Sequence, residues 1–67
     1  MWKVLAMFNE VMDENEEEST VVVEKTFDTY REMRNYVVTC ESQGAVGGFV
    51  MRYHPRDHVW YYYMDVQ

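Results

Sequence analysis

Four side chains in this sequence could carry acid–base or metal chemistry at neutral pH: Cys40, His54, Asp57 and His58. The two imidazoles and the carboxylate could hold a metal ion at the surface, but their spacing matches no structural zinc motif. Cys40 would act as a nucleophile only if it were exposed and close to one of the histidines. The sequence therefore predicts no catalytic residue, no bound metal and no cofactor.

Calcium binding is a second chemistry to consider, in the acidic stretch. Asp13, Asn15 and Glu17, with Glu24 further on, imitate the ligand spacing of an EF-hand loop. Glu18 stands where that loop needs glycine for its turn, and the flanking residues read as strands and not as helices. We therefore interpret positions 12–19 as a charged, solvated loop.

The same stretch dominates the charge of the chain, which is −6. Six of the twelve acids are Glu10, Asp13, Glu14, Glu16, Glu17 and Glu18. Such a stretch repels a phosphate backbone, so no direct nucleic-acid binding is expected, and it attracts a protein with a basic surface. In an alternative interpretation it imitates phosphates and occupies the basic groove of a nucleic-acid-binding protein.

The elements that must position these residues are four strands and one helix. Alternating apolar residues predict strands at 2–11, 20–27, 45–53 and 58–66, the last two joined by a turn at Pro55. The acidic loop can join the first two strands as an antiparallel hairpin. Gly47 and Gly48 indicate a bulge or a close backbone approach, and they lack the lysine and helix of a phosphate-binding loop.

The helix is predicted from its ends and its apolar stripe. Thr29 and Glu32 form a capping box at the start, and Gly44 suits a left-handed cap at the end. The residues of the stripe fall within about 120° of a helical wheel: Tyr30, Met33, Tyr36, Val37 and Cys40. A free cysteine on such a stripe normally behaves as a small hydrophobic residue, so we expect Cys40 in the core.

These elements predict a single α+β domain spanning residues 1–67. Its order is β-β-α-β-β, with a four-stranded, mainly antiparallel sheet and one helix packed on one face. One helix covers only one face, yet the last strand is aromatic on both. We assign the largest rings and their neighbours to the core under the helix: Phe49, Met51, Trp60 and Tyr62. Val50, Tyr61 and Tyr63 are then expected outside with Leu5 and Met7, as a surface for a partner or for a second copy in a homodimer.

The expected compartment is the cytoplasm. Cys40 is the single cysteine, which fits a reducing environment. The first residues do not resemble a signal peptide, and no apolar run approaches the roughly 20 residues of a membrane helix. We therefore expect no membrane association.

The junction Phe27-Asp28-Thr29-Tyr30-Arg31-Glu32-Met33 is similar to the strand-to-helix junction of many small phage and bacterial β-β-α-β-β domains. With its acidic, aromatic-rich composition and lone cysteine, the chain resembles the small host-takeover proteins that bacteriophages make early in infection. The resemblance implies a non-enzymatic inhibitor or modulator of a larger host protein, such as nucleic-acid-handling machinery, in the host cytoplasm. This class shares no motif, so it implies no functional residue.

Overall fold

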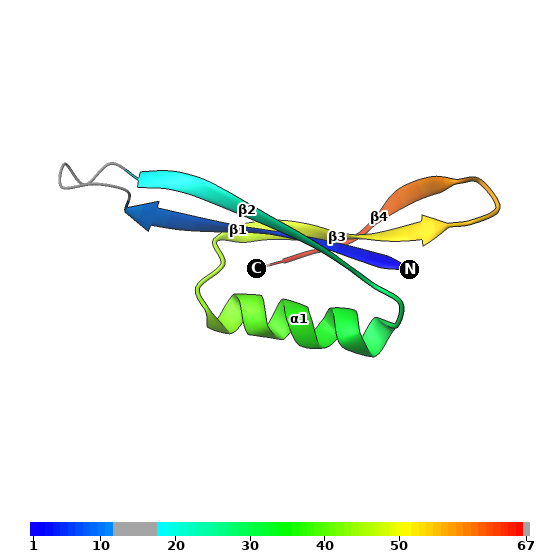
Figure 1. Ribbon diagram of the computed structural model, residues 1–67, viewed down its shortest axis with the longest axis horizontal. Helices are drawn as coiled ribbons and strands as arrows, with labels where there is room; N and C mark the ends of the chain where they lie inside the picture. The colour runs from blue at the N-terminus through cyan, green and yellow to red at the C-terminus, as the bar shows by residue number, and fades with distance from the viewer. Residues whose placement is uncertain (12–17, 67) are drawn as a thin grey trace.

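The computed structural model describes residues 1–11 and 18–66. Its elements are β1 (Trp2–Val11), β2 (Glu18–Phe27), α1 (Tyr30–Ser42), β3 (Gly47–His54) and β4 (Val59–Asp65). The strands form one antiparallel sheet in the order β2-β1-β3-β4, and α1 packs beneath it (Figure 1). The predicted α+β fold and element order are confirmed.

The β1–β2 hairpin is longer than the sequence pattern predicts. β2 begins at Glu18 and not at Thr20, and the ladder continues through Glu10 opposite Ser19 to Val11 opposite Glu18. The hydroxyl group of Thr20 lies 3.4 Å from the side-chain oxygen of Asn9 across the hairpin. Part of the predicted acidic loop therefore belongs to the sheet.

The helix begins and ends at the predicted caps. The hydroxyl oxygen of Thr29 accepts a hydrogen bond from the backbone N–H of Glu32 at 3.2 Å. Glu32 does not reach back to the Thr29 amide; its carboxylate accepts from the Thr29 hydroxyl at 3.0 Å. At the other end Gly44 has a φ of +91°, and Ala45 donates to the carbonyl of Cys40. These are the bonds of a Schellman motif, which needs a left-handed residue at this position.

A close approach of β3 to β1 holds the centre of the sheet. Val4 lies opposite Val50, and Ala6 lies opposite Gly48. Gly48 has a φ of +142°, and a Cβ atom there would overlap the carbonyl oxygen of Leu5. The close approach predicted for the two glycines is therefore confirmed at Gly48.

The β3–β4 hairpin turns through residues 55–58. Asp57 donates a backbone hydrogen bond to His54, and His58 adopts a left-handed φ of +54° before β4 begins. His54 pairs with Val59 and Tyr53 with Trp60, and the register shifts between Val50 and Met51. The extra residue is Tyr63 of β4, so the bulge lies opposite the middle of β3 and not at the predicted glycines.

The core is a thin layer between α1 and the middle of the sheet. Its buried members are Trp2, Val4, Met33, Val37, Val50 and Val66. The molecule measures 49 × 21 × 15 Å, with a radius of gyration of 13.8 Å. A compact chain of this length has about 11 Å. Both hairpins extend beyond the ends of α1, which therefore covers only the central part of one face (Figure 1).

Candidate protein-binding surface

The sheet face opposite α1 has no covering element among the described residues. Side chains alternate between the two faces of a strand, and directly opposite residues share a face. The ladder pairs Leu5 with Phe49, Met7 with Val22, Met51 with Tyr62, and Tyr53 with Trp60. We call this surface the open face and define it by eight apolar side chains: Leu5, Met7, Val22, Phe49, Met51, Tyr53, Trp60 and Tyr62.

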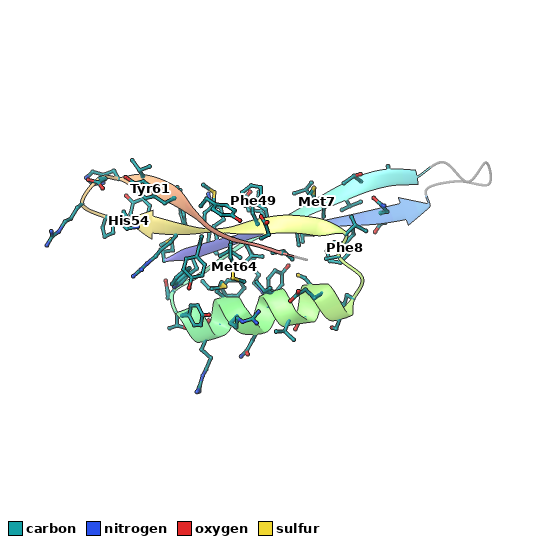
Figure 2. All side chains as sticks on the ribbon, turned by 180° about the vertical axis from the view of Figure 1, so that it is seen from behind. Met7, Phe8, Phe49, His54, Tyr61 and Met64 are labelled. Carbon is teal, nitrogen blue, oxygen red and sulfur yellow. The ribbon has the colours of Figure 1, made fainter. Side chains whose placement is uncertain are left out.

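The open face exposes large apolar side chains. Val22 is 56% exposed, Phe49 38% and Tyr62 63%. The other members are half-buried against one another. Figure 2 shows Met7 and Phe49 on the side of the sheet away from α1, whereas Met64 points towards the helix. A continuous apolar patch of this kind marks an interaction surface more often than an idle one.

One basic side chain crosses the open face. The Nζ atom of Lys3 lies 4.3 Å from the centre of the Trp60 ring and 3.3 Å from a carboxylate oxygen of Glu24. The ring faces the cation, and the carboxylate on β2 balances its charge. Lys3 on β1 thereby connects β2 with β4 across the open face and shields part of the Trp60 ring.

Hydrogen bonds fix two tyrosines at the β4 side of this face. The hydroxyl group of Tyr62 donates to Asp65 at 2.8 Å, and that of Tyr53 lies 3.2 Å from Nδ1 of His58. The hydrogen bond with the Asp65 carboxylate raises the pKa of Tyr62 above its ordinary value of 10.0. The rings are thus held in place before any partner arrives, which reduces the side-chain entropy that binding must remove.

The predicted assignment of the two faces is wrong for β3 and β4. Phe49, Met51, Trp60 and Tyr62 do share a face, but it is the open face and not the core. Val50 is fully buried under α1 and is not available to a partner. Under the helix, Met33 and Val37 pack with Trp2, Val4 and Val50, so β3 contributes a valine and not a large ring to this layer.

Tyr61 and Tyr63 consequently lie on the α1 side of the sheet, away from Leu5 and Met7. The Tyr63 ring packs edge-to-face on Trp2, with the ring centres 4.8 Å apart. Tyr61 stands beside His54, 4.6 Å between ring centres, where the hairpin extends beyond the helix (Figure 2). Both remain nearly half exposed. Tyr61 lies beyond the end of α1, whereas Tyr63 also meets Tyr30 at the start of the helix, with 6.3 Å between the ring centres.

The acidic residues can be placed only in part. Glu10 is exposed on β1. Glu18 starts β2, but its side chain lies outside the described part of the chain, as do Asp13, Glu14, Glu16 and Glu17. The EF-hand interpretation fails, since the second half of its loop, from Glu18 to Glu24, belongs to strand β2.

The possible nucleophile Cys40 and the possible metal ligands of the turn lie on different elements. Cys40 is buried on α1, as predicted, and lies in the core beside Tyr36. Partial burial, together with the neighbouring Cys40 side chain, raises the pKa of Tyr36. His54, Asp57 and His58 are exposed on the β3–β4 hairpin.

Three absences hold for residues 1–11 and 18–66. No three His, Cys, Asp or Glu side chains lie close enough to hold a metal ion. This part of the chain encloses no pocket. None of its helices has the length and apolar character to cross a membrane.

Six residues of the open face are not predicted as surface residues from the sequence: Val22, Phe49, Met51, Tyr53, Trp60 and Tyr62. One feature of the sequence could have placed them. Ala6 and Gly48 are small residues that allow a close approach, and the alternation from Gly48 through Val50 to Arg52 marks the face that lies under the helix.

Comparisons with protein families, with characterised proteins and with solved structures find no match to this chain.

Proposed function

We propose that the chain is a non-enzymatic protein-binding module whose open face binds a larger protein. The single observation that carries this proposal is the exposure of Phe49, Tyr62 and Val22 together on one uncovered sheet face. Aromatic residues and methionine are enriched in protein interfaces, and a few buried rings supply most of the binding energy.

Charge supports a partner with a basic surface around its contact site. The chain carries −6, and Glu10 and Glu24 are exposed on the two strands next to each other in the sheet. Opposite charges accelerate the encounter of two proteins, while the apolar contacts determine how long they stay together. The acids at 13–18 would add to this attraction.

The partner that best fits this chemistry is nucleic-acid-handling machinery, because such proteins present basic grooves to their substrates. By occupying or distorting that region the module would inhibit or redirect the larger protein. The resemblance to host-takeover proteins of bacteriophages supports the same role, exerted in the cytoplasm of the host. In this role the chain needs no cofactor and no catalytic residue.

Two matched substitutions test the proposal. Val22 on the open face and Val38 on the outer side of α1 have similar exposed fractions, 56% and 52%. Val22→Lys and Val38→Lys therefore add the same charge and remove a similar exposed side chain. A protein captured from the host lysate by the wild-type chain should be lost with Val22→Lys and kept with Val38→Lys.

A second variant tests the energetic role of the rings. With the captured protein in purified form, Phe49→Ser combined with Tyr62→Ser should weaken binding by about 2 kcal/mol or more if either ring is a hot spot. The circular dichroism melt should remain cooperative, since both rings are exposed. Equal binding by all four proteins would contradict the proposal.

A further inference from the structure

β4 is the least covered strand of the sheet. It forms one edge, since the strand order is β2-β1-β3-β4, and α1 packs mainly against β1 and β2. Tyr61 is 45% exposed and Tyr62 63%, although the two rings lie on opposite faces. Both faces and one edge of this strand are therefore open to contact.

The two edges of the sheet differ in how they are protected. An edge strand offers unpaired N–H and C=O groups, and proteins discourage pairing there with charged residues or proline. β2 carries charged residues along its length, including Glu24 and Lys25. β4 carries no charge and no proline from Val59 to Met64. From Val59 to Met64, β4 is thus free of the residues that oppose the addition of another strand.

The sequence of β4 is complementary to itself in one antiparallel register. If Tyr61 lies opposite its own copy, Trp60 lies opposite Tyr62 and Val59 opposite Tyr63. Every one of these pairs joins residues of the same face, because Tyr63, the extra residue of the β3–β4 ladder, packs on Trp2 and so lies on the face of Tyr61. Aromatic and β-branched pairs across strands stabilise a sheet, and none of the residues from Val59 to Tyr63 is charged.

Charge also favours a second copy at this edge over other places on the sheet. β2, which continues into the acidic stretch, lies at the opposite edge from β4. Pairing through β4 therefore keeps the most acidic parts of two copies as far apart as the sheet allows, and repulsion between exposed charges falls off within about 8–10 Å in salt.

From these observations we propose that two copies of the chain pair edge to edge through β4, antiparallel and centred on Tyr61. The two four-stranded sheets then form one continuous sheet of eight strands. Their open faces lie on the same side and join into one surface of twice the size. The dimer goes beyond the proposed function and does not depend on it.

The dimer also compensates for the small core. A domain of fewer than about 70–80 residues rarely gains enough stability from one core, and association with another chain is a common remedy. Only a thin layer of buried residues lies under α1 here. Edge pairing would cover Tyr61, Tyr62 and Tyr63 along one side.

Sedimentation of the wild-type chain, of Tyr61→Lys and of Val22→Lys tests this proposal. The wild type should pass from monomer to dimer with rising concentration. Tyr61→Lys places two ammonium groups opposite each other and should weaken the dimer about tenfold or more, with partial recovery in high salt. Val22→Lys adds the same charge on β2 and should leave the dimer unchanged.

Hydrogen exchange of the wild type keeps the proposal testable if Tyr61→Lys does not fold. The outward amides of β4 should be protected at concentrations where the dimer forms and should exchange rapidly in dilute monomer, while β2 amides stay unaffected. A wild type that is monomeric at all concentrations would overturn the proposal. So would a dimer that survives Tyr61→Lys and is lost with Val22→Lys, since that pattern places the contact on the open face.

The same variants separate this proposal from the proposed function. Partner capture that persists in a monomeric Tyr61→Lys protein would support the open face as a binding surface in its own right. A dimer that persists while capture is lost with Val22→Lys would support the edge contact independently.

Discussion

The ammonium group of Lys3 lies over the ring of Trp60, with 4.3 Å between the nitrogen and the ring centre. The contact joins β1 to β4 across β3 on the open face. Lys3→Met keeps most of the apolar stem and removes the charge, so the free energy of unfolding should fall by only about 1 kcal/mol or less. Thermal melts check this value, and the difference between the two proteins should shrink in high salt. A loss of several kcal/mol would show that the contact anchors the fold.

Gly48 and Gly44 should respond very differently to alanine. A Cβ atom on Gly48 would overlap the backbone of β1, whereas a Cβ atom on Gly44 has nothing within 4 Å. Gly44→Ala should cost about 1 kcal/mol for its positive φ alone. Gly48→Ala must also displace β1 from β3, so we expect loss of cooperative folding. Urea unfolding of the two variants measures the contrast, and similar midpoints would contradict the close approach.

Cys40 should be unreactive in the native protein. Its side chain is buried against the sheet, so a thiol reagent can reach it only when the fold opens. Under native conditions labelling should be slow and should accelerate as urea is added. Rapid stoichiometric labelling would contradict the burial of Cys40 and would indicate a reactive thiol.

The hydroxyl group of Tyr62 should ionise above pH 10. Its hydrogen bond to Asp65 stabilises the neutral form, which raises its pKa above 10.0. A raised pKa contributes stability that is present below pH 10 and is lost as the pH rises through the folded-state pKa. Asp65→Asn should bring the pKa of Tyr62 back towards 10.0 in a tyrosinate absorbance titration. The pKa of Tyr36 serves as the control, because its shift comes from burial and Cys40.

The helix, the strands and the alternation of side chains along each strand could be predicted, because residues close in the sequence determine them. Thr29 and Gly44 set the ends of the helix, and alternation shows that Trp60 and Tyr62 share a face. Which face the helix covers depends on tertiary packing. The prediction chose the face with the largest rings, but β3 contributes Val50 to the core under the helix, and its Gly48 lies against the backbone of β1.

The strand order and the exposed edge also depend on contacts that local patterns do not encode. The placement of β1 between β2 and β3 follows from long-range pairing, such as Val4 opposite Val50. The start of β2 at Glu18 shows the same effect, because cross-strand hydrogen bonding extends a strand into residues of low strand propensity.

α1 covers the sheet face that carries Trp2, and in the proposed function the face that carries Trp60 binds the partner. Paired melts of Trp2→Ala and Trp60→Ala, monitored by circular dichroism, test it with the same chemical change on each face. Trp2 is 8% exposed and packs in the core, so its loss should cost about 3–5 kcal/mol and unfold so small a domain. Trp60→Ala should remain folded with a cost of about 1–2 kcal/mol. An unfolded Trp60→Ala beside a folded Trp2→Ala would contradict this assignment of the two faces.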